Sequence, residues 1–148
     1  MSFFGSLDVS ASGLTAQRLR MDVTAENLAN AQTTRSAQGG PYRRKEVVLE
    51  EAGAGGFGAS LASAMNGGSA PTTDGVQVAG IVEDPSNFKT VYDPGNPDAN
   101  AQGYVRMPNV DTVTEMTDLI SASRAYEANV TAMQTAKQMF AKTLDLLR

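Results

Sequence analysis

Residues 111–147 read DTVTEMTDLISASRAYEANVTAMQTAKQMFAKTLDLL, and small or apolar side chains recur in this segment every three or four positions. This spacing is typical of one face of an α-helix. At ~1.5 Å per residue the segment would form a rod of about 55 Å, which can bury its apolar stripe only against another long helix. The stripe consists of Leu119, Ala122, Tyr126, Met133, Ala136, Phe140 and Leu147, widened by Met116, Ile120, Val130 and Leu144 and interrupted by Asn129 and Thr143.

The beginning of this segment has the residues of a helix N-terminus. Asp111 or Thr112 can cap the helix, because a short polar side chain accepts hydrogen bonds from backbone N–H groups that have no partner inside the helix. Thr112 and Glu115 also have the spacing of a capping box, in which each side chain bonds the backbone N–H of the other residue. We therefore predict a helix that begins near residue 112.

A second apolar stripe runs through about residues 3–34. Its members are separated alternately by four and three positions, and Arg18 interrupts them once. This is the heptad spacing of a helix that packs lengthwise on another helix. We expect two long terminal helices packed as an antiparallel, coiled-coil-like pair, although periodicity alone also allows contacts between subunits. The stripe is Leu7, Ala11, Leu14, Met21, Ala25 and Leu28.

The middle of the chain, residues 35–107, has a different character. Residues 42–50, 75–83 and 88–92 alternate enough to predict strands, and the glycine-rich stretch at about 53–73 predicts a flexible loop. The basic residues Arg43, Arg44 and Lys45 are followed at once by Glu46, which suggests a solvated strand edge or an interface charge. The expected fold is mainly α, with residues 1–34 and 108–148 forming a helical domain around an extended, partly β, Gly/Pro-rich middle.

Gly53, Gly55 and Gly58 match the G-x-G-x-x-G fingerprint of dinucleotide-binding proteins, with Asp74 roughly twenty residues further on. The strand-like run before the motif is highly charged, whereas a strand inside a parallel sheet is buried on both faces. No series of βαβ units follows. A flexible linker is the better interpretation, and we expect no cofactor.

The segment from Asp93 to Asn100 offers alternating oxygen atoms that resemble calcium ligands. A calcium-binding EF-hand loop also needs a glycine at its sixth position and a glutamate at its twelfth. Two prolines stiffen this segment, and Asp-Pro-Gly and Asn-Pro are turn-forming sequences in their own right. We interpret the segment as a series of turns and expect no metal site.

The composition argues against several classes of function. The chain has no histidine and no cysteine, which removes the commonest general base, the commonest metal ligand and any disulfide framework. The net charge of −4 is unlike that of a nucleic-acid-binding protein. No cleaved signal peptide is evident. No small-molecule substrate site is evident either, so we expect a protein that is not an enzyme.

Several stretches resemble the axial proteins of the bacterial flagellum, which form its rod and hook. Residues 10–18 and 22–33 resemble the N-terminal signature of that family, whose core here is Asn27-Leu28-Ala29-Asn30 followed by Thr33. Further similarity lies in Tyr42-Arg43-Arg44-Lys45 and in the ranges 91–99, 103–111, 115–120 and 123–130. These stretches resemble the proximal-rod proteins of the flagellar basal body.

This resemblance implies a structural subunit of the periplasmic rod, exported without a cleaved signal peptide through the flagellar type III apparatus. Its partners would be other copies of itself, other rod proteins and neighbouring basal-body or export-gate components. Another flagellar axial protein or a type III-secreted helical hairpin stays the alternative. The expected assembly interface is Leu7, Leu14, Met21, Asn27, Leu28, Asn30, Leu119, Tyr126, Val130, Met133, Phe140, Leu144 and Leu147.

Overall fold

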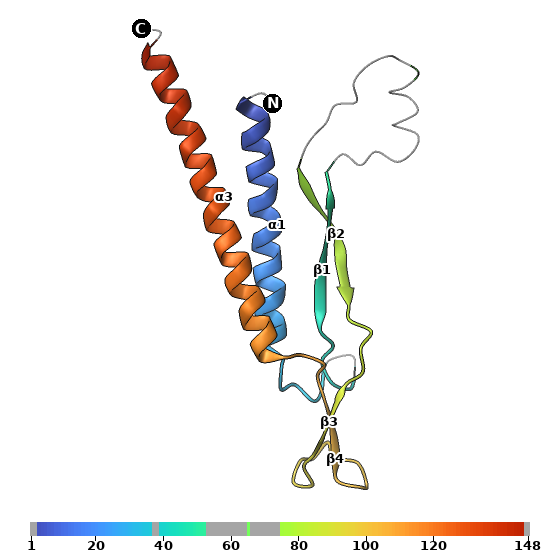
Figure 1. Ribbon diagram of the computed structural model, residues 1–148. Coiled ribbons are helices and arrows are strands. Elements are labelled where there is room, and N and C mark those ends of the chain that lie inside the picture. Colours follow the sequence, from blue (N-terminus) through green and yellow to red (C-terminus); the bar gives the residue numbers. More distant parts are fainter. Residues whose placement is uncertain (1–2, 37–38, 53–64, 66–74, 147–148) are drawn as a thin grey trace.

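The computed structural model describes residues 3–36, 39–52, 65 and 75–146. A long helix opens this part of the chain, two β-hairpins follow, and a second long helix closes it (Figure 1). The predicted glycine-rich loop lies outside the described residues except for Met65. The elements are α1 (Phe3–Ala29), β1 (Lys45–Glu51), β2 (Val76–Glu83), β3 (Lys89–Tyr92), β4 (Tyr104–Met107) and α3 (Thr112–Leu146).

The two helices lie side by side and run in opposite directions, as predicted (Figure 1). Two contacts fix their register. The amide of Asn27 bonds the carboxylate of Glu115, and a Cβ atom added to Gly13 would lie 3.0 Å from the side-chain nitrogen of Asn129. Gly13 therefore lets the backbone of α1 approach the polar residue that interrupts the stripe of α3.

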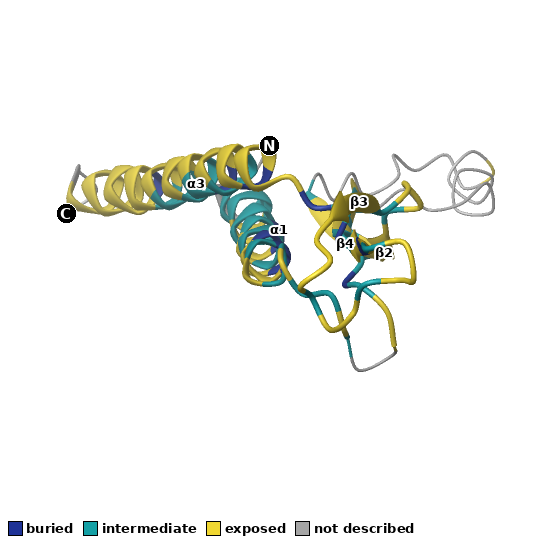
Figure 2. Ribbon diagram, turned by 90° about the horizontal axis from the view of Figure 1, so that it is seen from below, coloured by how far each residue is buried: buried dark blue, intermediate teal, exposed yellow. Residues whose placement is uncertain are grey.

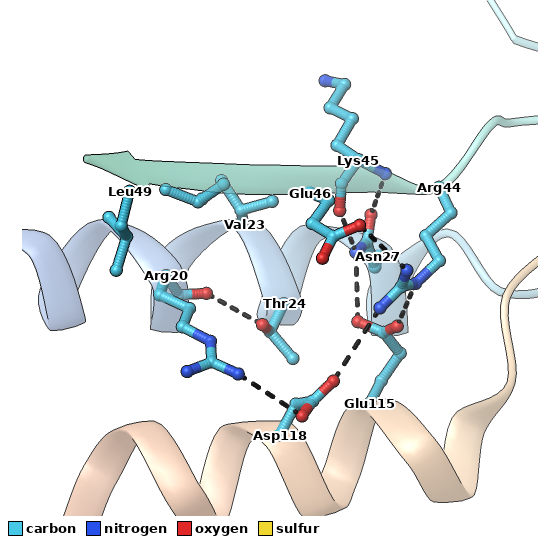
Figure 3. Close-up of a pocket in the computed structure, with 11 residues that line it drawn as sticks. Arg20, Val23, Thr24, Asn27, Arg44, Lys45, Glu46, Leu49, Glu115 and Asp118 are labelled. Atoms are coloured by element: carbon cyan, nitrogen blue, oxygen red, sulfur yellow. Dashed lines mark hydrogen bonds and ion pairs between the residues drawn. The ribbon is translucent and has the colours of Figure 1, made fainter. Parts of the chain in front are cut away.

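The side of α1 that meets α3 differs from the predicted stripe. Asn27 and Ala16 are buried, whereas Ala11 and Ala25 are exposed. Val23 is also buried, but it lies beside β1 (Figure 3). The larger members of the predicted stripe, Leu7, Leu14, Met21 and Leu28, are half-buried. The heptad thus lies beside the line of closest approach to α3, which runs through Gly13, Arg20 and Asn27.

The N-terminus of α3 is capped by Asp111. Its Oδ1 atom accepts hydrogen bonds from the backbone N–H groups of Val113 at 3.0 Å and Thr114 at 3.3 Å. The hydrogen bond from Thr114 has the largest effect in lowering the pKa of the Asp111 carboxyl group, and the hydrogen bond from Val113 comes next. The predicted capping box is wrong, because the side chain of Glu115 is buried against α1 and Arg44 and does not turn back toward Thr112.

The expectation of an extended, Gly/Pro-rich middle is also wrong for the residues that the structure describes. β1 pairs antiparallel with β2, and β3 pairs antiparallel with β4. Hairpin pairing satisfies backbone N–H and C=O groups that an extended segment would leave to water. The three predicted strands are present. β4 is an additional strand, which is defined only by its pairing with β3.

The prolines and glycines of residues 93–103 are confined to the turns that join β3 to β4. Side-chain oxygens of Asp93, Asn96 and Asn100 accept hydrogen bonds from the backbone N–H groups of the residues two positions further along the chain. The Oδ2 atom of Asp98 accepts a hydrogen bond from the hydroxyl of Thr34 at 2.8 Å. The oxygen atoms that resembled calcium ligands therefore hold this segment in successive turns and tie it to the chain after α1.

The elements form layers, with α1 between α3 and the β1–β2 hairpin (Figures 1 and 2). The hydroxyl of Ser12 on α1 accepts a hydrogen bond from the backbone N–H of Val76 at the start of β2. Figure 2 shows that most of the surface of α3 is exposed, with a narrow buried line toward α1. Neither α1 nor α3 is apolar enough over a sufficient length to cross a membrane.

Replacing Gly13 with valine should destabilise the helix pair, because even its first carbon would meet Asn129 at 3.0 Å. We expect a loss of about 1–3 kcal/mol, the usual cost of overfilling a packed contact. Thermal unfolding of the purified chain, followed by circular dichroism, measures this loss. Ala25→Val, on the exposed side of the same helix, is the matched control. An equal loss in both variants would contradict the observed register.

Candidate functional site

Asn27 lies at the point where α1, β1 and α3 meet, and its side chain is 1% exposed. Its amide nitrogen donates to the backbone oxygen of Lys45 at 2.8 Å and to the carboxylate of Glu115 at 3.0 Å. Its amide oxygen accepts from the backbone N–H of Lys45 and from the hydroxyl of Tyr42, both at 2.9 Å. Both donors and both lone pairs of the amide are thus used.

Glu115 is the second member of this cluster and is also 1% exposed. Its Oε1 atom accepts a hydrogen bond from Nε of Arg44 at 2.6 Å, while Oε2 accepts from Asn27 (Figure 3). The hydrogen bond to Glu115 is the main cause of the raised pKa of Arg44. A buried carboxylate is strongly destabilising without partners, and here one cation and one amide supply them.

The guanidinium group of Arg44 forms ion pairs with three further carboxylates. Glu46, Asp84 and Asp118 lie 3.7, 3.5 and 3.8 Å from its nitrogen atoms. These partners come from β1, from the end of β2 and from α3, so one cation joins three elements. Figure 3 shows Arg44 with Glu46 of β1 and Asp118 of α3. We name the cluster of Asn27, Tyr42, Arg44 and Glu115 the junction.

Main-chain contacts support the junction from the side of the hairpins. The backbone N–H of Arg44 donates to the side chain of Asn109 at 2.8 Å, and its carbonyl accepts from the backbone N–H of Asp84 at 2.9 Å. Asn109 also donates to the hydroxyl of Ser86 at 2.9 Å. Hydrogen bonds from the backbone and hydroxyl of Ser86 lower the pKa of Asp84, which keeps it an anion beside Arg44.

Tyr42 completes the junction as a neutral donor. Burial first, and then the nearby carboxylates of Glu26, Glu115 and Glu83, raise its pKa to about 12. Lys45 bonds Glu26 at 2.6 Å, and its ammonium group lies 5.7 Å from the centre of the Tyr42 ring. The hydroxyl therefore keeps its proton and its bond to Asn27 across the neutral pH range.

A cavity of about 230 Å³ adjoins the junction. Its charged walls pair with one another, as Arg20 does with Asp118 at 3.5 Å. Among the described residues no group of three acidic side chains is placed to hold a metal ion. The arrangement serves to hold four segments of the chain together.

Comparisons with known proteins found two matching family models and several similar proteins. Residues 7–35 match the family model described as "Flagella basal body rod protein", and residues 101–146 match "Flagellar basal body rod FlgEFG protein C-terminal". The Flagellar basal-body rod protein FlgC of Bacillus subtilis is 54% identical over 150 residues, which cover 99% of each chain. The chain belongs to the FlgC family of flagellar basal-body rod proteins.

Other FlgC proteins are similar over almost the whole chain. That of Escherichia coli O6:H1 is 44% identical, covering 99% of this chain and 98% of its own. That of Borreliella burgdorferi is 43% identical, covering 100% of this chain and 99% of its own. As a FlgC-family protein, the chain is a structural rod subunit of the flagellar basal body and assembles with other flagellar rod components.

The structure divides the residues predicted for an assembly interface into three groups. Asn27 and Asn30 make hydrogen bonds within the subunit, the latter to Glu26 and Thr33. Phe140 and Leu144 are exposed near the end of α3, and Leu147 lies outside the described residues. The remaining residues are half-buried along the helices, namely Leu7, Leu14, Met21, Leu28, Leu119, Tyr126, Val130 and Met133.

Three members of the junction were missed as a site by the sequence analysis. Arg44 was assigned to a solvated strand edge or interface charge, Glu115 to a capping box, and Tyr42 only to a strand. The one available signal was that all three lie in stretches that resemble rod proteins, as Asn27 does. Nothing in their spacing along the chain indicates that they meet.

Replacing Glu115 with alanine should destabilise the folded subunit by about 3–5 kcal/mol, since it leaves the partly buried Arg44 and the amide of Asn27 without their partner. Chemical denaturation of the purified chain measures the loss. Glu127→Ala, at an exposed position of the same helix, should change stability little. Similar losses in the two variants would remove Glu115 from its role in the junction.

Tyr42 should ionise with a pKa of about 12 instead of the ordinary value near 10. Its folded-state pKa is raised, so its contribution to stability is present in full below about pH 10 and is lost as the pH rises toward 12. Ultraviolet titration of tyrosinate measures this transition. Tyr42→Phe should remove it, and a late transition that persists in that variant would contradict the assignment.

Proposed function

We propose that this chain forms part of the proximal rod and polymerises there through α1 and α3. The observation that carries the proposal is the apolar surface that α3 leaves exposed. Val113 is 72% exposed, Met116 51%, Ile120 56% and Leu144 52%. Such a surface on a soluble protein marks a site of protein contact.

The half-buried stripe of α1 supports the same proposal. Leu7, Leu14, Met21 and Leu28 follow a heptad, although the line of closest approach to α3 passes beside them. A heptad that its own subunit covers only partly suits a helix from a neighbouring subunit. We therefore assign the stripe, together with Leu119, Tyr126, Val130, Met133, Phe140, Leu144 and Leu147, to contacts between subunits.

The junction has a separate part in this function. Asn27 is buried within the subunit, so it acts by fixing how the β1–β2 hairpin sits on the helix pair. A drive shaft transmits torque only if its subunits keep their shape under load. The paired charges of Arg44 and Glu115 supply a rigid connection at the base of the two helices.

The resemblance to rod proteins supports three further parts of the proposal. The chain would cross the inner membrane unfolded through the flagellar type III export apparatus, reach the periplasm without cleavage, and bind neighbouring basal-body and export-gate components. Its part would be structural and without enzymatic activity, as the names of its relatives suggest. No small-molecule substrate, cofactor or nucleic acid enters this proposal.

The test is complementation of a motile bacterium that lacks its own FlgC. The wild-type chain should restore swimming and be found in purified basal bodies by mass spectrometry. Leu14→Asp should prevent both, because it places a charge in the proposed contact. Thr15→Asp, on the exposed neighbouring position, is the matched control.

Circular dichroism of both purified variants separates assembly from folding. If Leu14→Asp folds like the wild-type chain and the bacterium that carries it still swims, this stripe is not an assembly contact. If the wild-type chain itself is absent from the basal bodies, the proposed function fails.

A further inference from the structure

Two arginine side chains line one pocket of about 390 Å³ beside the β3–β4 hairpin. Arg35 lies in the chain that follows α1, and Arg106 lies on β4. Figure 1 places this hairpin beyond the end of the helix pair at which α3 begins. None of the described residues that line the pocket belongs to α1 or α3, so the pocket is separate from the helical faces used in the proposed function.

The charges of these two arginines have no counter-ion in the part of the chain that the structure describes. The ion pairs found there include neither Arg35 nor Arg106, whereas Arg44 alone reaches four carboxylates. One carboxylate lines the pocket, that of Asp98, and its Oδ2 atom accepts a hydrogen bond from Thr34 at 2.8 Å. The pocket thus has an excess of positive charge in a chain whose net charge is −4.

The ring of Phe88 holds Arg106 in place. The guanidinium carbon of Arg106 lies 4.9 Å from the centre of this ring, and that of Arg43 lies 4.5 Å from the same centre. Arg43 is itself fixed by a hydrogen bond to the backbone oxygen of Asp84 at 2.8 Å. A guanidinium group that stacks on a ring keeps its N–H donors in the plane in which a carboxylate binds. Because Arg106 is already restricted, it loses less conformational entropy when an anion binds.

Two exposed tyrosines extend this surface along the β3–β4 hairpin. Tyr104 lines the pocket and is 45% exposed, and its ring centre lies 5.3 Å from that of Tyr92, which is 63% exposed. Gly103 permits this arrangement, because its φ angle is +81° and a Cβ atom there would lie 2.8 Å from the ring of Tyr92. Tyrosine and arginine are enriched among the residues that dominate the binding energy of protein interfaces. The combination therefore indicates a protein as the partner.

A larger groove of about 680 Å³ adjoins the pocket, because Arg35 lines both. Arg43 also lines the groove, together with the carboxylates of Glu26 and Glu83. Lys45 forms an ion pair with Glu26 at 2.6 Å, which leaves Glu83 against the two arginines. The pocket and the groove together form one surface on which an extended segment can lie.

We propose that this surface, the arginine pocket with its adjoining groove, docks an extended acidic segment of a different protein. Two carboxylates of that segment each bind one guanidinium group, Arg35 or Arg106, through paired N–H···O bonds. An aromatic or apolar side chain of the segment packs on Tyr104. Nucleic acid suits the surface less well, because its dense phosphate charge rewards a long basic face, whereas Asp98 lines this pocket. The proposal goes beyond the proposed function, which uses α1 and α3.

Fluorescence anisotropy tests the proposal with the purified full chain and a labelled peptide of alternating glutamate and serine that contains one central tyrosine. We expect saturable binding that weakens as salt is added, because exposed ion pairs are screened. The same peptide with every glutamate replaced by glutamine should not bind. Arg35→Gln combined with Arg106→Gln should weaken binding of the acidic peptide about tenfold, the combined effect of two exposed ion pairs.

The matched control removes two positive charges elsewhere. Arg18→Gln combined with Lys137→Gln changes exposed positions on the two helices and should bind the acidic peptide like the wild-type chain. Arg35→Gln alone leaves the contact between Arg106 and Phe88 intact, and it should weaken binding about threefold. Melting curves check the fold of each variant, and the single variant decides the matter if the double variant unfolds. Equal losses in the control and the double variant would show unspecific attraction and overturn the proposal.

The other possible occupants give results of their own. Tighter binding of a single-stranded DNA oligonucleotide of the same charge would assign the surface to nucleic acid and not to an acidic protein segment. Sedimentation measures whether the chain associates with itself, and self-association that only the Arg35→Gln, Arg106→Gln variant abolishes would make a second copy the occupant. Either result overturns the proposal. The rod function is unaffected by both, because complementation in the bacterium tests it separately.

Discussion

The structure depends on one buried carboxylate. Glu115 stands at the first turn of α3, accepts a hydrogen bond from Arg44 at 2.6 Å and holds the amide of Asn27 at 3.0 Å. An isolated buried charge is costly, so each of these groups is stable in its place only because the other two are present. The helix pair and the hairpin are consequently fixed at one shared point, where their charges and hydrogen bonds are satisfied together.

Apolar packing alone is modest in this subunit. Three of the buried apolar residues of the two helices are alanines, Ala16, Ala122 and Ala136, which contribute little area each. Larger side chains such as Ile120 and Leu144 are instead more than half exposed. The protein thus combines a polar, well-determined centre with apolar outer faces, which is the distribution expected of a part whose burial is completed by its neighbours.

Periodicity predicted the elements better than it predicted their contacts. Both helices and three strands follow from spacing, because the period of a pattern depends on local geometry. The face of α1 that meets α3 was predicted wrongly, because the heptad of large residues was expected to lie against α3, whereas Gly13 and Asn27 lie there. Small and polar residues gave no signal there. The role of Glu115 could not be predicted, because a capping box and a buried ion pair place the same residue at the same helical position.

The bond between Asn27 and Glu115 joins residues 88 positions apart in the sequence. Contacts of such long range require closure of a large loop of chain before any stabilisation is gained, and they slow folding. The polar centre cannot form from either terminal segment alone, whichever end of the chain becomes available first. Completion of the subunit is therefore coupled to the presence of the entire chain, so that a fragment lacking α3 keeps Asn27 and Arg44 without their common partner.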